Sequence, residues 1–372
     1  MLFQDEQLRI AVVWTEVSGY LSACLRHLYS HHQIDLLVIS NLANRKADSR
    51  RPFSESLFDW IPQYHIVKGR NPISRVSTIR QHLKAFEPHV LVMAFQWRYP
   101  ECYVVASDAN RLGTLTVGTM DNPWRGNVSQ HCAALIRNAL NFFAFDAIWV
   151  PGERTAQYAR RLFGSETSIL RGLYSADTAA FEPAWLRRRN SEMSQGGFVF
   201  TGRLVPEKGI QELAVAYEIY RRQATNPWPL TIIGEGPEAT RLRGMAGVRM
   251  LGFLQVEDIV EELAGAKAFV LPSQFEPWAV AIHEATVAGL PIICSDACGA
   301  AVELVQDGFN GFVFPAGDAR ALSRCLYLMS TADDPRSIFG ENSRALSDRY
   351  SPALWANTLM RFAKDRLSVT GK

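Results

Sequence analysis

Short apolar runs alternate with longer amphipathic stretches along the whole chain. The runs are rich in Val, Ile, Leu and Phe and have the length of strands, whereas the stretches between them have helical periodicity. Because this alternation is typical of βαβ units, it predicts parallel sheets joined by helices throughout. The predicted strands lie near Ile10–Trp14, Asp35–Ile39, Val90–Phe95, Thr114–Thr119, Ala147–Val150 and Thr167–Leu170, and then near Phe198–Thr201, Pro229–Ile233, Val248–Leu251, Ala268–Leu271, Pro291–Cys294 and Gly311–Phe314.

The alternation lapses between Tyr174 and Gln195, where small, polar and charged residues predominate, and it resumes at Gly197. A segment of this kind commonly connects domains, so we expect a linker there and two open α/β sheets in tandem. Ligands of such sheets bind outside the carboxyl ends of the strands, here in a cleft between domains. The last amphipathic segment, about Pro352–Leu367, can pack on either domain.

Composition narrows the class of protein. The 372 residues contain 39 Lys and Arg against 37 Asp and Glu, so a nucleic-acid protein held by phosphate attraction is not expected. Six scattered cysteines without a CxxC pair favour a reducing compartment. The N-terminus does not have the pattern of a secretory signal, and the apolar run Ala139–Val150 is too short to span a bilayer. We expect a cytoplasmic protein, at most peripheral at the inner face of the membrane.

A cationic turn follows the predicted strand at Phe198–Thr201. It reads Gly202-Arg203-Leu204-Val205-Pro206-Glu207-Lys208-Gly209 and precedes a helical pattern that begins near Ile210. A turn at Pro206 would bring Arg203 and Lys208 toward one point, beside the free N–H groups of the helix, which is how a phosphate site is assembled. The alternative is a solvated turn whose cations face water.

Two carboxylates eight residues apart flank the start of another predicted helix. Because Pro277 suits the first helical position, Glu276 lies at the mouth of the helix and Glu284 roughly 12 Å further along it. This length matches an extended sugar nucleotide, with Glu276 on sugar hydroxyls, the N–H groups of Trp278–Val280 on phosphate and Glu284 on a ribose diol. The alternative is a helix with a hydrated polar face, although an unpaired Glu284 among apolar neighbours would be costly.

A glycine-rich turn, Gly234-Glu235-Gly236-Pro237-Glu238-Ala239, satisfies the dinucleotide pattern G-x-G-x-x-G/A. It supports an NAD-dependent oxidoreductase as an alternative, although it follows the second strand of its half and Gly-Pro before a helix is ordinary turn chemistry. The sequence contains neither a Walker A pattern nor an Asp-x-Asp pair. Without an acidic pair for Mg²⁺, the charge of a diphosphate would be met by Arg203, Lys208 and helix ends.

Taken together, these motifs resemble those of the retaining GT-B glycosyltransferases of family 4 (glycosyl transferases group 1). That family shares a Gly-Arg-x4-Lys turn, a Gly-x-Gly-Pro turn, a Glu-x7-Glu motif and a following Gly-x-Pro. The resemblance runs in order from about Ser175 to Arg324. The matching residues are Gly202, Arg203 and Lys208; Gly234–Pro237; Glu276 and Glu284; Gly289–Pro291; Ala300–Val305, Asn310 and Gly311; and Asp177–Phe181.

The resemblance implies two Rossmann-like domains whose parallel sheets face each other across a cleft. Residues 1–174 would bind the acceptor, residues 175–352 the nucleotide-sugar donor, and a final helix, about 353–372, would pack back on the first domain. The implied catalytic residues are Arg203, Lys208, Glu276 and Asp121. The implied donor-binding residues are Gly19, Tyr20, Gly202, Arg203, Lys208, Leu251, Phe253, Glu276, Trp278, Ala279, Val280 and Glu284.

The sequence departs from the family pattern at two places. Trp278-Ala279 stands where members often carry Phe-Gly, which would narrow or reshape the sugar pocket. Many members also place a His after the fourth N-terminal strand, and the corresponding region here, Gly118–Trp124, offers Asp121 instead. The alternative for Asp121 is an Asx turn before Pro123.

The resemblance therefore implies a retaining glycosyltransferase that needs neither metal nor cofactor. Its donor would be UDP-glucose or a related UDP-hexose, with GDP-mannose as an alternative, and its acceptor a glycan or lipid-linked hydroxyl in polysaccharide biosynthesis. The departing phosphate would take up the acceptor proton, without a covalent glycosyl-enzyme. Two other functions stay open: the NAD-dependent oxidoreductase and a non-catalytic nucleotide-sugar-binding protein. The cationic residues Arg45, Lys46, Arg50 and Arg51 either contact anionic lipid or form a solvated loop.

Overall fold

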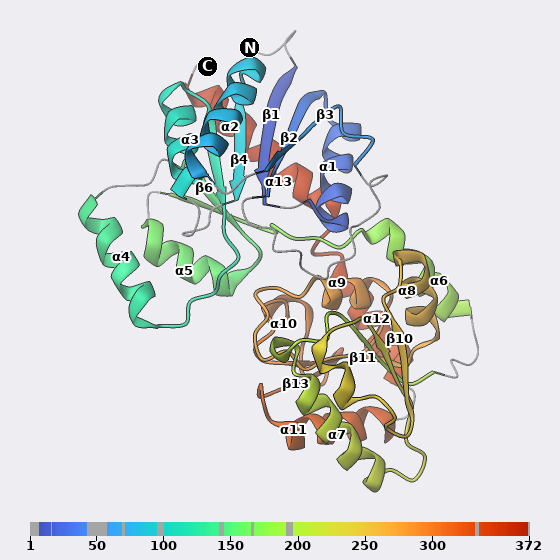
Figure 1. Ribbon diagram of the computed structural model, residues 1–372. Helices are drawn as coiled ribbons and strands as arrows, with labels where there is room; N and C mark the ends of the chain where they lie inside the picture. Colours follow the sequence, from blue (N-terminus) through green and yellow to red (C-terminus); the bar gives the residue numbers. More distant parts are fainter. Residues whose placement is uncertain are drawn as a thin grey trace. The chain divides into compact units, whose positions relative to one another are not determined.

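The computed structural model divides the chain into two compact units (Figure 1). One comprises Met1–Ser175 together with Pro352–Lys372, and the other comprises Ala176–Ser351. The residues that the structure describes are 7–15, 17–42, 58–68, 71–94, 100–140, 145–164, 167–190, 196–331 and 335–370. The cationic residues Arg45, Lys46, Arg50 and Arg51 lie outside them.

The first unit contains a seven-stranded sheet in the order β3-β2-β1-β4-β5-β6-β7, and all its described strand pairs are parallel. The six strands expected from the apolar runs are confirmed, but β3 was not anticipated. Of the six residues of β3 only Val67 is buried, so this edge strand carries no continuous apolar run. The elements are β1 (Leu8–Trp14), α1 (Gly19–His31), β2 (Ile34–Leu42), β3 (Gln63–Lys68), α2 (Pro72–Phe86), β4 (Val90–Ala94), α3 (Pro100–Arg111), β5 (Leu115–Thr119), α4 (Val128–Leu140), β6 (Ala147–Val150), α5 (Glu153–Phe163), β7 (Ser168–Arg171) and α13 (Pro352–Thr370).

The C-terminal helix α13 completes the core of the first unit. It packs with α1 on one face of the sheet, and Figure 1 shows it in red beside β1 and β4. Trp355 stacks on Trp149 of β6 with 4.6 Å between ring centroids. Its indole N–H donates to the Leu173 carbonyl oxygen at 2.9 Å. The buried aromatic pair thus fixes the end of the chain on the sheet formed by its beginning.

The second unit contains a six-stranded parallel sheet in the order β10-β9-β8-β11-β12-β13. All six predicted strands are confirmed. Because β9 lies on one side of β8 and β11 on the other, the strand order reverses at β8, which is where open α/β sheets bind ligands. The elements are α6 (Thr178–Asn190), β8 (Phe198–Thr201), η2 (Pro206–Lys208), α7 (Ile210–Gln223), β9 (Leu230–Ile233), η3 (Pro237–Arg241), β10 (Val248–Gly252), α8 (Val256–Gly265), β11 (Ala268–Leu271), α9 (Val280–Val287), β12 (Ile292–Ser295), α10 (Ala301–Leu304), β13 (Gly311–Phe314), α11 (Ala319–Thr331) and α12 (Pro335–Ser347).

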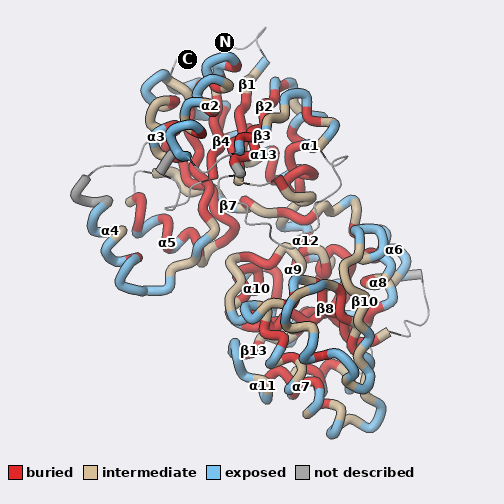
Figure 2. The backbone as a smooth tube through the Cα atoms, viewed as in Figure 1, coloured by how far each residue is buried: buried red, intermediate tan, exposed pale blue. Residues whose placement is uncertain are grey.

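The segment expected to be a linker is largely helical. Helix α6 occupies Thr178–Asn190 within the second unit and packs against α8. Its inward face holds the buried Phe181 and Ala184, whereas Leu186 is half exposed and Arg187 forms an ion pair with Glu261. The helix therefore has few buried apolar residues, which explains why the sequence pattern failed to indicate it. Figure 2 shows α6 as a largely exposed or intermediate segment at the edge of the second unit.

Candidate functional site

The cationic turn crosses the carboxyl end of β8 and is fixed by its own backbone. The Leu204 N–H donates to the Glu235 carbonyl oxygen at 2.8 Å, which joins this turn to the one after β9. Gly209, at φ +67°, ends η2 and begins α7. A Cβ at Gly209 would lie 2.0 Å from the Pro272 carbonyl oxygen, so only glycine lets this turn approach the end of β11. The cationic turn therefore runs from the carboxyl end of β8 to that of β11, at the point where the strand order of the sheet reverses.

Lys208 and Glu276, which belong to two separate sequence motifs, lie next to each other in the structure. The Lys208 ammonium forms an ion pair with the Glu276 carboxylate, and the two side chains are only 17% and 14% exposed. The loop that carries Glu276 is held by a backbone hydrogen bond from the Gln274 N–H to the Glu207 carbonyl oxygen at 2.8 Å. The pair is thus partly desolvated, and each charge compensates the other.

Arg203 does not join this pair. Its side chain is exposed, and within the described part of the chain no hydrogen bond or ion pair connects it to Lys208 or Glu276. Gly202 lies closer, since a Cβ there would be 3.9 Å from Cε of Lys208. The convergence of the two cations expected from the turn is therefore not seen, and Arg203 would have to move to reach a ligand at Lys208.

The start of α9 has an unusual backbone. Ala279 adopts φ +85° and ψ +74°, in the left-handed region that favours glycine. Trp278 is 3% exposed and packs on Tyr350 with ring centroids 5.1 Å apart. Its indole N–H is buried and has no acceptor among the described residues. Trp278, which stands where members of the family often carry Phe, thus lies with its side chain inside the second unit.

Glu284 lies one turn into α9 with its carboxylate unpartnered within the described residues. Burial, and to a smaller extent the neighbouring carboxylate of Asp177, raise the pKa of Glu284 to about 7. Such a group is costly to the folded protein unless a ligand uses it. Asp177 comes directly after the point at which the chain enters the second unit.

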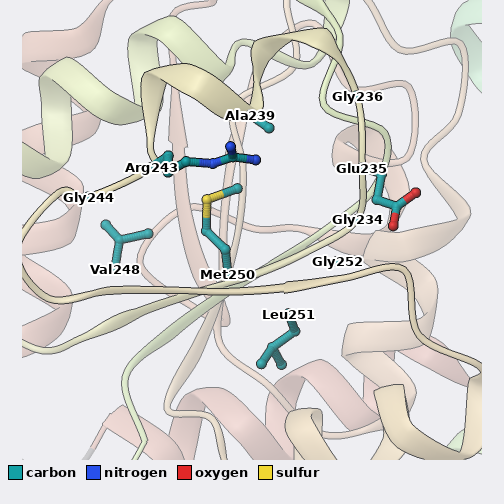
Figure 3. Close-up of a pocket in the computed structure, with 10 residues that line it drawn as sticks. All are labelled: Gly234, Glu235, Gly236, Ala239, Arg243, Gly244, Val248, Met250, Leu251 and Gly252. Carbon is teal, nitrogen blue, oxygen red and sulfur yellow. The ribbon is translucent and has the colours of Figure 1, made fainter.

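A pocket of about 630 Å³ lies beside the carboxyl ends of β9 and β10 (Figure 3). Figure 3 shows the Arg243 guanidinium and the Met250 side chain in the space between η3 and β10, with Leu251 on the other side of the strand. Leu251, one of the residues that the family resemblance implies for donor binding, lines the pocket, whereas Phe253 does not. The lining residues are Gly234, Glu235, Gly236, Ala239, Arg243, Gly244, Val248, Met250, Leu251 and Gly252.

The glycines of the dinucleotide-like pattern have a packing role. A Cβ at Gly234 would lie 1.9 Å from the Gly202 carbonyl oxygen, and one at Gly236 would lie 2.2 Å from that of Leu204. Both glycines also have positive φ angles. The pattern is therefore accounted for by the close approach of two turns of the chain, without a dinucleotide.

Three candidate residues of the first unit lie in one group. Gly19 begins α1, and the ring of Tyr20 meets that of Tyr174 edge to face at 5.4 Å between centroids. The Tyr174 hydroxyl donates to Oδ2 of Asp121 at 3.1 Å. An Asx turn from Asp121 to Pro123 is excluded because proline has no backbone N–H to donate. Tyr174 thus orients the carboxylate of Asp121, a role that the sequence motifs did not reveal.

The comparisons with known proteins agree with this geometry. Residues 183–346 match the family glycosyl transferases group 1. The matched segment includes every site residue described above for the second unit except Asp177 and Tyr350. An exopolysaccharide phosphotransferase of Streptomyces coelicolor is 28% identical over 217 residues, which are 56% of this chain and 22% of that protein. A glycogen synthase of Mycobacterium tuberculosis is 31% identical over 182 residues, 47% of this chain and 42% of the relative. The chain thus spans less than half the length of either relative.

Solved structures confirm the predicted GT-B fold. A glycosyltransferase from Rickettsia africae superposes with a TM-score of 0.74 at 14% identity, over 97% of this chain and 99% of that one. HepE from Anabaena in complex with UDP and glucose superposes with a TM-score of 0.70 at 18% identity, over 96% and 100% of the two chains. At this identity the likeness concerns the fold alone.

Within the described ranges, no three His, Cys, Asp or Glu side chains are grouped so as to hold a metal ion. The described helices also include none that is long and apolar enough to cross a membrane.

Proposed function

We propose that the protein is a metal-independent, retaining glycosyltransferase that moves a hexose from a nucleotide sugar to a glycan or lipid-linked hydroxyl in polysaccharide biosynthesis. One observation carries the proposal: Lys208 and Glu276 meet at the reversal point of a parallel sheet, beside the helix that carries Glu284. This set offers a cation for a diphosphate and two carboxylates for hydroxyls. The match of residues 183–346 to a glycosyltransferase family supports it.

In the proposed complex, Lys208 contacts the diphosphate, and Arg203 moves in from solvent as a second cation. Glu276 and the backbone of Trp278, Ala279 and Val280 hold the sugar, while Glu284 accepts hydrogen bonds from the ribose hydroxyls. The base lies near Leu251 and Phe253, at the end of the pocket formed by Gly234 and Gly252. Chemistry depends on stabilising the leaving diphosphate, and the cations strengthen their contacts as charge builds on it.

The proposed contribution of the first unit is Gly19, Tyr20 and Asp121. Gly19 has no positive φ angle, and nothing lies within 4 Å of a Cβ built there. Neither the backbone conformation nor the packing of the first unit requires glycine at position 19. A glycine there is instead explained by the close approach of a donor phosphate in the proposed complex. Asp121, oriented by Tyr174, would position the acceptor hydroxyl or the sugar, while the departing phosphate takes the proton.

The nucleotide is the first property to test. We propose a UDP-hexose as donor, in line with the complex of HepE with UDP and glucose, and GDP-mannose as the alternative, because a GDP-mannose-dependent mannosyltransferase of Corynebacterium glutamicum is 34% identical over 120 residues. A thermal-shift screen with UDP, GDP, ADP and NAD(H) discriminates among these ligands, since a ligand that binds only the folded state raises its stability. A response to NAD(H) alone would overturn the proposal. Binding of a nucleotide sugar without transfer or hydrolysis would leave a binding protein instead of an enzyme.

Replacing Glu276 by glutamine is expected to separate binding from transfer. Glu276→Gln frees Lys208 from its ion pair, so the affinity for a nucleoside diphosphate without sugar should rise several-fold, about 1 kcal/mol. Transfer should fall by about 10²-fold, because the sugar loses an acceptor for its hydroxyls. Calorimetry with UDP and GDP, together with turnover measurements, checks both results. Weaker diphosphate binding in the variant would contradict the assignment of Lys208.

Replacing Ala279 by glycine tests the strained backbone at the start of α9. Because Ala279 has φ +85°, Ala279→Gly removes a strain of about 1–2 kcal/mol, offset by about 0.5–1 kcal/mol from the greater freedom of glycine in the unfolded chain. We expect the unfolding temperature to rise slightly, and activity to be retained because the backbone N–H groups keep their directions. Ala281→Gly, within the same helix, is the matched control and should lower the unfolding temperature.

A further inference from the structure

His283 is a fully buried polar residue in the middle of α9, where the sequence pattern favours an apolar side chain. Its Nδ1 accepts a hydrogen bond from the Ala176 N–H at 2.8 Å, so this nitrogen carries no proton. The proton is therefore on Nε2, which lies 3.2 Å from the Ser347 carbonyl oxygen and donates to it. One neutral imidazole thus satisfies two buried backbone groups that are far apart in the sequence.

The two partners of the ring lie close to the places where the chain passes between its units. Ala176 is the first residue of the second unit, and Ser347 precedes the exit at Ser351 by four residues. The ring of Tyr350, near the same exit, lies 5.9 Å from that of His283 and 5.1 Å from that of Trp278. The imidazole of His283 therefore connects α9 to Ala176, where the chain enters this unit, and to Ser347, close to where the chain leaves it.

The hydrogen bond between the Ala176 N–H and His283 also holds Asp177, the charged residue that acts on Glu284. Asp177 follows Ala176 directly, and its other side is held by α6, since Oδ1 of Asp177 accepts from the Ala180 N–H at 3.3 Å. Asp177 is the charged group that raises the pKa of Glu284 in addition to burial. Around the ring itself, the charged groups are Arg344 and Asp348, and burial lowers the pKa of His283 to about 4, so the ring stays neutral near pH 7.

We propose that His283 is a positioning residue for Glu284: by holding Ala176 it fixes the stretch of α9 that carries Glu284 against the entering segment and thereby sets the affinity for the ribose of the donor. This inference rests on the proposed function, in which Glu284 binds that ribose. Without the ring acceptor, the buried Ala176 N–H must find another partner, and the entering segment has to shift. Since Glu284 acts by binding, the shift should raise KM for the nucleotide sugar more than it lowers kcat.

Three substitutions of the ring separate its two hydrogen bonds. In His283→Asn the side-chain oxygen replaces Nδ1 and keeps the bond from Ala176, whereas in His283→Gln the amide replaces Nε2 and keeps the bond to Ser347. His283→Leu has a similar volume and keeps neither. We expect all three to lower the unfolding temperature. The affinity for UDP or GDP should stay within about 2-fold of wild type in the Asn variant and fall about 10-fold in the other two, a loss of about 1.4 kcal/mol.

Calorimetry with UDP and GDP between pH 6 and pH 8, well below the unfolding temperatures, provides the test. The inference is supported if affinity follows the Ala176 bond and not stability. Equal losses in the Asn and Gln variants, or wild-type affinity in all folded variants, would overturn it and leave a purely structural histidine. Asp177→Asn, which leaves the ring and its bond to Ala176 intact, should lower the pH midpoint of nucleotide binding and leave the affinity at pH 8 within about 2-fold of wild type. An affinity loss of about 10-fold at pH 8 overturns the inference, because the loss would then come from Asp177 and not from the ring. If the wild-type protein binds no nucleoside diphosphate, the proposed function itself is wrong.

Discussion

Lys208→Ala is expected to lower the turnover number by about 10²–10³-fold, the usual effect of removing a group that stabilises charge in a transition state. Among the described residues, Lys208 is the one cation that forms an ion pair with Glu276. Its side chain is partly desolvated, so its charge acts on the diphosphate with little screening. The affinity for the nucleotide sugar should fall less than turnover, because charge on the bridging phosphate oxygen increases as the bond to the sugar breaks. Steady-state kinetics with the donor found in the nucleotide screen measures both quantities.

The controls for this variant follow from the ion pair. Removing Lys208 leaves Glu276 without its counter-charge, so thermal unfolding must show that the variant is folded at the assay temperature. Arg222→Ala is the matched control: Arg222 lies on α7 in the same unit, is 74% exposed and forms a surface ion pair with Glu218 one turn away, so activity should be unchanged. Turnover of Lys208→Ala within a few-fold of wild type would refute the role proposed for this residue.

The sequence predicted most strands of the two sheets because those strands are buried on both faces. In β1, β4 and β8, for example, nearly every residue is buried, so each appears in the sequence as a continuous apolar run bounded by polar residues. The pattern failed where burial is sparse, at the edge strand β3 and at helix α6. Apolar periodicity in a sequence indicates which faces of a helix or strand are buried. A helix or strand with few buried residues therefore shows little apolar periodicity.

The candidate site could be predicted in part, for a different reason. Glycines and charges at strand ends pointed to Lys208, Glu276 and Glu284, because the carboxyl ends of parallel strands meet at one edge of the sheet. That Lys208 pairs with Glu276 while Arg203 stays in solvent depends on the backbone of two loops, which no spacing reveals. His283 and Tyr174 were missed since their partners are 107 and 53 residues away. A histidine beside the apolar residues Ala281, Ile282 and Ala285 of a short helix was the signal available for the first of them.

Glu284→Gln is expected to weaken nucleotide binding by about 10–100-fold and, in the same protein, to raise stability above neutral pH. The loss of affinity follows because a carboxylate accepts hydrogen bonds from both ribose hydroxyls, each worth about 1.5–3 kcal/mol when an ionised group takes part. Binding to wild type should also strengthen as pH rises through 7, the pKa of Glu284, since the ionised form is the acceptor. The variant should show no such dependence, which calorimetry at pH 6 and pH 8 will measure.

The gain in stability follows from the direction of the pKa shift. The pKa of Glu284 is raised from 4.5 to about 7 on folding, so the folded state holds the proton more tightly than the unfolded state does. Below pH 4.5 both states are protonated and the carboxyl has no effect; between pH 4.5 and 7 the unfolding free energy falls as pH rises, and above 7 the full cost remains. For a partly exposed side chain that cost is at most about 3 kcal/mol.

Unfolding temperatures of wild type and Glu284→Gln should therefore coincide near pH 4 and diverge by several degrees at pH 8, with the variant higher. Glu341→Gln is the matched control, because Glu341 is exposed on α12 and its replacement should leave the pH dependence unchanged. A carboxylate in a ligand site can lower the stability of the folded protein and still be required for binding. A residue with a purely structural role would not combine these two effects. If the variant is less stable than wild type at pH 8, Glu284 has a partner that holds it in the fold, and its role in binding the ribose has to be abandoned.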